Sequence, residues 1–229
     1  MLLKDEWLTS VIEKDVFNLD VNNIDKFEFS DFPTLAALIT ARIQVGDLKR
    51  CSLLQKLNFS LVSTDVQLQR NMELIEMSNF NIRFAEAKDE ICVEGIANSS
   101  FTYDRFHSDS NIKNGIAGKI KSEWAKNYFR NIRGDFMVVA EVNGIVSGFL
   151  QLLKDKNNSL VIDLIAVKNN VRNMGIARAM VSFTIANFQG MDSIRVGTQL
   201  NNLPSLRLYT KLNFYVKSAY YIFHYHITI

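Results

Sequence analysis

Cysteine and proline are both scarce in this chain, whose 229 residues include two of each. Cys51 and Cys92 have no metal-ligand spacing between them, so the sequence offers neither a zinc motif nor a disulfide framework. A single disulfide stays open, but two unrelated thiols in a reduced cytosol are the simpler interpretation. The low proline content argues against long disordered linkers.

Long apolar runs and blocks of one charge are also missing. No apolar run approaches the roughly 20 residues that a membrane helix needs, and the first residues, Met1–Glu6, are charged too early for a signal peptide. The net charge is +2 without a block of Lys or Arg, which argues against a nucleic-acid binder but allows a mildly basic pocket for a phosphorylated ligand. We therefore expect a cytoplasmic protein with neither a membrane nor a nucleic acid as its partner.

What the chain does contain is an ordinary globular composition and a weak internal repeat. The length supports one large domain or two smaller ones. The run Lys56-Leu57-Asn58-Phe59 recurs as Lys211-Leu212-Asn213-Phe214, and leucines upstream match at helical spacing. The asparagine at each helix end fits a left-handed cap. Each copy predicts a strand, a helix and a second strand, at 38–45, 47–57 and 59–68 and again at 193–200, 203–212 and 214–226.

The second part of the chain is longer and richer in elements. The dipeptide Asn143-Gly144 is a strong hairpin signal. This pattern predicts an α+β fold with a mixed, mostly antiparallel sheet flanked by helices, divided into residues 1–70, a linker at 71–79, and residues 80–229. Apolar patterning predicts further strands at 80–86, 136–141, 145–153 and 160–167, and helices at 89–99, 112–130 and 175–188.

A polar turn between the strand at 160–167 and the next helix carries the first chemical signal. A helix N-terminus presents unpaired backbone N–H groups and partial positive charge. Gly175 lets the backbone approach a phosphate, Ala177 leaves the first turn uncrowded, and Arg172 adds charge. This pattern suits a pyrophosphate, although an ordinary strand–helix turn with an incidental glycine explains these residues equally well.

Two signatures resemble those of the GNAT acetyltransferase superfamily. Arg172-x-x-Gly175-x-Ala177 is similar to R/Q-x-x-G-x-G/A. Asn202-x-x-Ser205-x-x-x-Tyr209-x-x-x-Asn213-Phe214 is similar to N-x-x-A-x-x-x-Y-x-x-x-G-F, with Ser for Ala and Asn for Gly as departures. The resemblance implies a GNAT fold and acetyl-CoA as acetyl donor. The cofactor site that it implies consists of Ile165, Ala166, Val167, Arg172, Asn173, Met174, Gly175, Ile176, Ala177 and Asn202.

A narrower resemblance covers nearly the whole chain. Residues 54–62, 103–109, 124–133 and 198–221 look like the dTDP-fucosamine N-acetyltransferase group. This implies an N-acetyltransferase for a nucleotide-activated 4-amino-4,6-dideoxy sugar in surface polysaccharide synthesis. It also implies a homodimer and a smaller, degenerate GNAT-like first half. The alternatives are an acetyltransferase for an amino acid, peptide or polyamine, or a CoA-binding module without turnover.

Tyr209 is the candidate general acid of the implied reaction, in which a neutral amine attacks the thioester. A phenol with a pKa of about 10 is protonated at neutral pH and can donate to the departing thiolate. Tyr209 lies two helical turns after Asn202, so both are expected to face the cofactor. The alternative is a packed aromatic side chain of an amphipathic helix. Leu54 stands at the matching position of the first copy, so we expect that half to be non-catalytic.

The remaining candidates carry weaker signals. Asp163 interrupts an apolar strand and is a candidate proton relay, with a solvent-facing or cation-paired carboxylate as the alternative. Arg105, Phe106 and His107 are expected to contact the sugar nucleotide, since Arg suits phosphate and Phe can stack. A surface loop with one buried Phe explains them equally well.

Two histidines and two tryptophans complete the set. His224 and His226 share one face of a predicted strand, and without further ligands nearby no metal site is expected. Trp7 and Trp124 are expected to fill the core or an interface.

Overall fold

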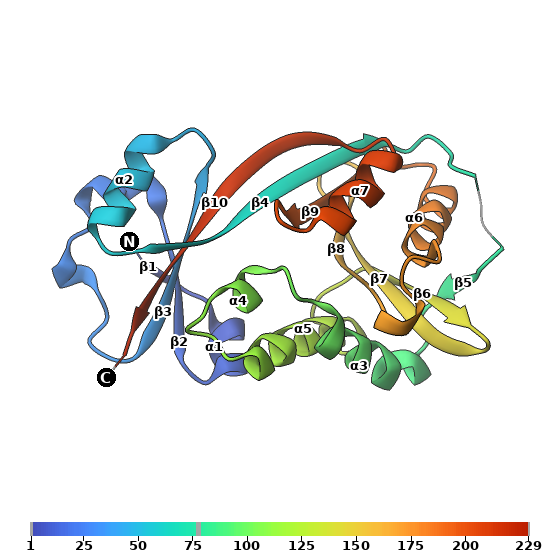
Figure 1. Cartoon of the computed structure of the whole chain (residues 1–229), viewed down its shortest axis with the longest axis horizontal. Coiled ribbons are helices and arrows are strands. Elements are labelled where there is room, and N and C mark those ends of the chain that lie inside the picture. Colours follow the sequence, from blue (N-terminus) through green and yellow to red (C-terminus); the bar gives the residue numbers. More distant parts are fainter. Residues whose placement is uncertain (1, 77–78, 229) are drawn as a thin grey trace.

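The computed structural model describes residues 2–76 and 79–228, which form one ten-stranded sheet in the order β1-β2-β3-β10-β4-β9-β8-β7-β6-β5 (Figure 1). The strands are β1 (Leu2–Lys4), β2 (Asp15–Leu19), β3 (Ala37–Gln44), β4 (Ser60–Asn71), β5 (Asn81–Phe84), β6 (Phe136–Val142), β7 (Ile145–Asp155), β8 (Ser159–Val167), β9 (Ser193–Gln199) and β10 (Tyr215–Ile227). The α-helices are α1 (Glu6–Ile12), α2 (Leu48–Lys56), α3 (Glu90–Ser100), α4 (Arg105–Ser108), α5 (Asn114–Phe129), α6 (Ile176–Asn187) and α7 (Leu203–Lys211). Short 3₁₀ helices include η1 (Val21–Lys26).

The α+β fold and its mixed sheet are as expected from the sequence. Only β2–β3 and β8–β9 are parallel pairs, and the other pairs are antiparallel. Asn143 and Gly144 form the predicted hairpin turn between β6 and β7, with φ angles of 52° and 74°. No helix in the described part of the chain is long and apolar enough to cross a membrane.

The internal repeat forms two strand–helix–strand units, β3-α2-β4 and β9-α7-β10, at the centre of the sheet. One row of paired residues runs Gln44, Tyr220, Asp65, Gln199 across β3, β10, β4 and β9. In the repeat, Gln44 corresponds to Gln199 and Asp65 to Tyr220. Exchanging each residue for its counterpart therefore gives the same row in reverse order. The two units are therefore related by a local pseudo-two-fold axis.

The helix ends of the two units match in detail. Asp47 caps α2 by accepting from the N–H of Arg50, and Asn202 caps α7 by accepting from the N–H of Ser205. Both helices end at an asparagine in the left-handed region, Asn58 with φ 61° and Asn213 with φ 59°, which confirms the predicted cap.

The two halves exchange strands rather than lying side by side. The last strand, β10, is inserted between β3 and β4 and pairs with both. The predicted linker at 71–79 begins with Asn71, the final residue of β4, and residues 77–78 lie outside the described residues. The division into 1–70 and 80–229 stays a prediction.

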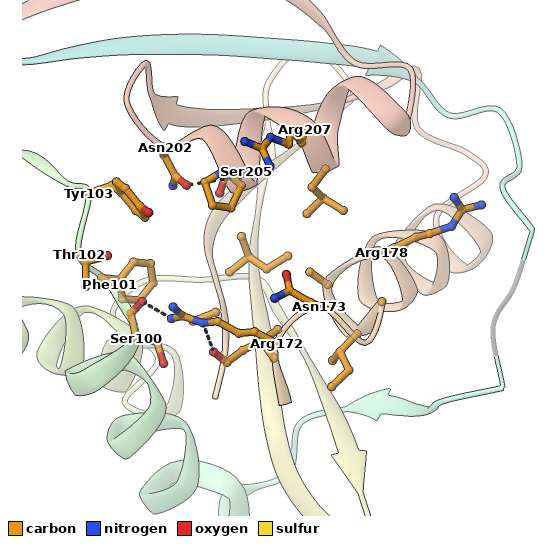
Figure 2. A pocket seen from close by; sticks show the side chains of 18 of the residues that line it. Ser100, Phe101, Thr102, Tyr103, Arg172, Asn173, Arg178, Asn202, Ser205 and Arg207 are labelled. Carbon is orange, nitrogen blue, oxygen red and sulfur yellow. Dashed lines mark hydrogen bonds between the residues drawn. The ribbon is translucent and has the colours of Figure 1, made fainter. Parts of the chain in front are cut away.

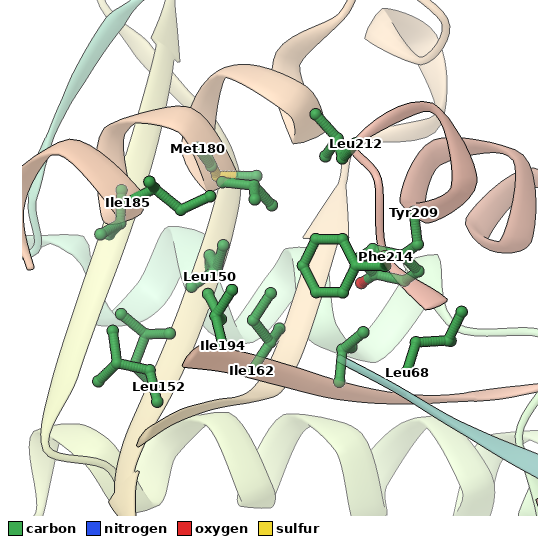
Figure 3. Packing of buried hydrophobic residues seen from close by; sticks show 14 of the residues in the cluster. Leu68, Leu150, Leu152, Ile162, Met180, Ile185, Ile194, Tyr209, Leu212 and Phe214 are labelled. Carbon is green, nitrogen blue, oxygen red and sulfur yellow. The ribbon is translucent and has the colours of Figure 1, made fainter. Parts of the chain in front are cut away.

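Helices cover both faces of the sheet and bury four apolar clusters. In Figure 1, α2, α6 and α7 lie on one side of the sheet, and α1, α3, α4 and α5 lie on the other. The largest cluster packs α6 and α7 against the central strands and contains Leu150, Ile162, Met180, Ile194 and Tyr209 (Figure 3). Apolar burial of this extent is the main favourable term that holds the two layers together.

Candidate functional site

The first feature of the site is a gap between two neighbouring strands. β8 and β9 pair only from Ser159 to Ile162 and from Ser193 to Val196, and then separate. The other edge of β8 stays paired with β7 as far as Val167. Residues 165–167 therefore have no backbone partner on β9, and apart from the Val167 oxygen, which accepts from Arg172, their groups on that side are available to a ligand.

The second feature is the N-terminus of α6, which follows the polar turn. Gly175 occupies the N-cap position with φ 92° and ψ 4°, and no side chain caps the helix. A Cβ at Gly175 would only touch Phe80, at 3.8 Å, so the glycine is needed for its backbone conformation and not for space. The N–H groups of the first turn are left available for an anion.

A cleft of about 820 Å³ joins these two features (Figure 2). It is lined by Ile165, Ala166, Val167, Arg172, Asn173, Gly175, Ile176, Ala177 and Asn202, which are the predicted cofactor residues except Met174. The side chain of Met174 is instead 53% exposed. Arg178, Arg207 and Lys211 also line the cleft. Sequence reasoning missed these three because basic residues on exposed helix faces carry no distinctive pattern.

Arg172 ties the turn to the opposite wall of the cleft. Its guanidinium donates to the backbone oxygen of Val167 at 3.2 Å and to that of Ser100 at 2.6 Å (Figure 2). Arg172 therefore fixes the turn against the end of α3 while adding positive charge to the cleft.

Asn202 and Tyr209 do not share a surface as the helical spacing had predicted. Asn202 caps α7 and lines the cleft, whereas Tyr209 is 1% exposed and is not among the lining residues. Its ring packs against Phe214, with centroids 5.1 Å apart, in the cluster that also holds Ile162 and Val196 (Figure 3). Those two are the last paired residues before β8 and β9 separate. Burial raises the pKa of Tyr209 well above that of an ordinary phenol, so the hydroxyl keeps its proton.

Asp163 lies where the register between β7 and β8 shifts, and its carboxylate is fully engaged. Arg133 donates to both oxygens, at 2.8 and 2.7 Å. The indole N–H of Trp124 and the amide of Gln151 also donate to Asp163, at 2.8 and 3.1 Å. The structure thus shows the cation-paired alternative for this residue.

A second cavity of about 380 Å³ is enclosed by α1, α4 and α5. Arg105 and Phe106 line it, but His107 does not: His107 Nδ1 lies 2.7 Å from the carboxylate of Asp104. Trp7 and Trp124 pack against neighbouring apolar clusters and also line this cavity, with ring centroids 5.7 Å apart. Their location in a cavity wall was not predicted.

Comparison with known proteins identifies the fold. Residues 103–214 match the model of the Acetyltransferase (GNAT) family. The chain contains a GNAT acetyltransferase domain. It is therefore an acyltransferase, and enzymes of this family take their acetyl group from acetyl-CoA.

Two known proteins are similar to this chain over most of its length. The Bacillus subtilis spore coat polysaccharide biosynthesis protein SpsD is 27% identical over 95% of this chain and 80% of its own length. An Escherichia coli dTDP-fucosamine acetyltransferase is 24% identical over 80% of this chain and 79% of its own length.

Solved structures show the same GNAT fold. A GCN5-related N-acetyltransferase from Sphaerobacter thermophilus superposes with a TM-score of 0.62 at 14% identity, over 85% of this chain and 61% of the other. A tandem GNAT protein from the clavulanic acid biosynthesis pathway superposes with a TM-score of 0.60 at 7% identity, over 92% and 75%.

The first half of this GNAT chain has a strand gap of its own, but the chain itself occupies it. β2 and β3 are parallel over Asp15–Asn18 and Ala37–Thr40 and then separate, as β8 and β9 do. The helix η1 follows β2 and packs against β3 and α2, and Arg50 Nε donates to the backbone oxygen of Val21 at 3.0 Å. Leu54, the counterpart of Tyr209, is fully buried there.

A buried polar cluster lies beyond the end of α4. His224 Nδ1 and His226 Nε2 both approach Asp109 Oδ2, at 2.6 and 2.7 Å. From the sequence, no further ligand was expected near the two histidines. That expectation was wrong, because the fold brings Asp109, which is distant in sequence, next to both. Because each ring nitrogen lies at direct hydrogen-bond distance from one shared oxygen, the cluster fastens the loop after α4 to β10.

Proposed function

We propose that this acetyltransferase transfers the acetyl group of acetyl-CoA to the amino group of a nucleotide-activated 4-amino-4,6-dideoxy sugar for surface polysaccharide synthesis. The main support for acetyl-CoA as the donor is the gap between β8 and β9, which opens beside the uncapped N-terminus of α6. The two relatives, a spore coat polysaccharide biosynthesis protein and a dTDP-fucosamine acetyltransferase, support the proposed acceptor.

The donor fits the cleft in an extended orientation. The free backbone edge at residues 165–167 suits the amide groups of the pantetheine arm. The first turn of α6, from Gly175, suits the pyrophosphate, with Arg172 beside it. Arg178, Arg207 and Lys211 offer positive charge for the remaining phosphate.

The proposed acetyl transfer assigns separate roles to the acceptor amine, the backbone of β8 and Tyr209. The acceptor amine, neutral before attack, forms the C–N bond while the C–S bond breaks, and the proton that the nitrogen then loses passes to water in the cleft. Free N–H groups along the β8 edge are placed to stabilise the carbonyl oxygen as it gains charge. Tyr209 gives its proton to the departing thiolate and regains one from water, because burial keeps its phenol protonated at neutral pH although it does not line the cleft.

Asp163 acts in this proposal by holding other groups in place rather than as a base. Its carboxylate accepts four hydrogen bonds from Arg133, Trp124 and Gln151, which favour its charged form and make it a weak base. A sugar amine is less basic than a lysine amine because neighbouring oxygens withdraw electrons, which reduces the need for a strong base.

The first half, residues 1–70, is proposed to be a degenerate GNAT-like unit that takes no cofactor, because η1 occupies its strand gap. We also propose that the enzyme works in the cytoplasm, where its donor is made, and as a homodimer. Light scattering on the purified chain tests the dimer, and a monomeric mass contradicts it.

The donor and acceptor parts of the proposal are tested separately. Acetyl-CoA should raise the melting temperature, because a ligand that binds only the folded state stabilises it by mass action. Absence of a shift with folded protein would remove the cofactor assignment. The acceptor is tested by measuring thiol release with nucleotide-linked 4-amino sugars, amino acids, peptides and polyamines. Turnover with the sugars and not with the other amines is expected.

A non-catalytic CoA-binding module is the competing function. It predicts a full thermal shift with acetyl-CoA but no thiol release with any acceptor.

A further inference from the structure

The second cavity is assembled from both halves of the chain. Trp7 comes from α1 of the first half, whereas Arg105 and Phe106 come from α4 and Trp124 and Asn127 from α5. The cavity lies next to the cofactor cleft, because Asp104, which precedes Arg105 directly, lines that cleft. A ligand in the cavity would therefore lie beside the cleft proposed to hold acetyl-CoA.

Arg105 brings positive charge to the cavity and forms no ion pair with the described residues, although Asp5, Asp65 and Asp104 favour its charged form at longer range. Its guanidinium makes one hydrogen bond within the described residues, from NH1 to Thr40 Oγ1 at 3.0 Å, and none of their carboxylates lies within ion-pairing distance. Burial lowers the pKa of Arg105, which reflects the cost of placing a cation there without a partner. A phosphate group is the ligand whose geometry and charge suit this fork of donors.

The other charged groups near the cavity are already engaged or lie behind its wall. Arg133 is paired with Asp163, and the Asp5 carboxylate caps α1 by accepting from the N–H of Leu8 at 2.9 Å. The amine of Lys121 lies 5.0 Å from the Trp124 ring and 4.0 Å from Asp104. Among the described residues that line the cavity, Arg105 is thus the cation without an ion pair, with Lys121 adding to the positive potential.

Aromatic faces and an unpaired amide provide the rest of a nucleotide site. The rings of Trp7 and Trp124 stand edge to face, 5.7 Å apart, and the Arg133 guanidinium lies over the Trp124 ring at 5.3 Å, so Trp7 is the ring proposed to stack on a base. Asn127 is only 3% exposed, yet its side-chain amide forms no hydrogen bond with the part of the chain that the structure describes. An amide carries both a donor and an acceptor, which suits the edge of a pyrimidine base.

We infer that this cavity binds the nucleoside diphosphate of the acceptor, with the diphosphate on Arg105 and the base between Trp7, Trp124 and Asn127. The inference rests on the proposed function for the identity of the acceptor, but it adds a role for the first half. α1 forms part of the acceptor site, so the degenerate half contributes to specificity although it holds no cofactor.

The chain itself offers a reporter for this site. Its two tryptophans, Trp7 and Trp124, both line the cavity, so intrinsic fluorescence reports this place and no other. Titration of the unmodified protein with dTDP alone, without acetyl-CoA, should change the tryptophan emission with saturable binding. Inorganic diphosphate should bind at least about tenfold more weakly, because base stacking is lost.

Variants of the cavity residues test whether dTDP binds in this cavity. Arg105→Gln and Asn127→Ala should each weaken dTDP binding about tenfold or more in calorimetry, while acetyl-CoA still raises the melting temperature. Trp7→Leu, a substitution in the first half of the chain that also removes the ring contact with Trp124, should weaken it to a similar extent. Arg130→Gln is the matched control, because Arg130 pairs with Glu123 on the surface, and it should bind dTDP normally.

The outcomes separate this inference from the proposed function. Failure of dTDP to bind, equal affinity for inorganic diphosphate, or unchanged binding in both Arg105→Gln and Asn127→Ala overturns the inference. Acetylation of a nucleotide-linked amino sugar would then leave the proposed function standing. Binding of dTDP that depends on these residues, without turnover of any amino sugar, supports the cavity assignment and contradicts the proposed function.

Discussion

Substitutions of single residues at the cofactor cleft give the most specific predictions about the chemistry. Replacing Tyr209 by Phe removes the proposed acid while keeping the ring that packs on Phe214. We expect turnover to fall about tenfold to a hundredfold, the range of general acid catalysis, with little change in affinity for acetyl-CoA. Steady-state kinetics check this, with Tyr215→Phe as control because Tyr215 is exposed. An unaltered rate in Tyr209→Phe would remove the assigned role.

Gly175 is the residue whose backbone conformation matters most for the phosphate turn. Its φ of 92° is costly for a residue with a Cβ, so Gly175→Ala should lower the free energy of unfolding by about 1–2 kcal/mol. It should also weaken acetyl-CoA binding, because the turn relaxes. Urea unfolding and calorimetry measure both effects. Gly190→Ala, at a position with open space and no positive φ, should change neither.

At this scale, sequence reasoning identified residues that line the cleft but not their surroundings. Gly175 and Asn202 were found because a short motif fixes their local backbone, and both line the cleft. Tyr209 was expected to face the cofactor, but helical spacing could not show that its face is packed against Phe214. Arg105 was expected to bind the acceptor, yet its partners in the cavity wall come from elements far apart in the sequence.

At the scale of elements, the loop after α4 depends on one buried carboxylate. Burial would raise the pKa of Asp109, but hydrogen bonds from His224 and His226 outweigh it and hold the pKa well below its usual range. Burial lowers the pKa of His224, opposed by Asp109. The unfolded chain therefore binds more protons than the folded one, first below about pH 6.5 for the histidine and then below about pH 4 for the carboxyl.

Stability should accordingly fall as the pH is lowered from 7 to 4. Asp109→Asn should reduce the free energy of unfolding at pH 7 by about 2–4 kcal/mol, since it removes a buried charged acceptor from two histidines. It should also flatten the pH dependence. Denaturant unfolding at several pH values tests both points. Asp25→Asn, which loses only an exposed pair with Lys49, should cost close to nothing.

The boundaries of the helices and strands were largely predictable from the sequence, but the pairing of the strands was not. Hydrophobic periodicity located α5, α6 and the strands β6 to β9 to within a few residues, because each pattern is local. The short α1 and α4 carry too few residues for a periodic signal. The insertion of β10 between β3 and β4 depends on contacts between distant segments, which no local pattern records.

At the scale of the whole molecule, the exchanged strands make the two halves one folding unit. A fragment of residues 80–229 retains the GNAT signatures but leaves both edges of β10 without their partners β3 and β4. We expect this fragment to aggregate, because long unpaired edges promote association. Co-expression with residues 1–76 should restore solubility and the thermal shift with acetyl-CoA. A soluble fragment that binds acetyl-CoA alone would contradict this view.

The insertion of β10 also has a consequence for synthesis on the ribosome. Translation delivers β3 and β4 early, but the strand that lies between them is made only after the whole cofactor cleft has emerged. Until β10 is made, the edges of β3 and β4 that pair with it are unpaired. Chaperones would have to shield these edges from other chains. A premature stop anywhere before residue 215 would leave the sheet permanently in that state, so even short losses from the β10 segment should be as damaging as losing a catalytic residue.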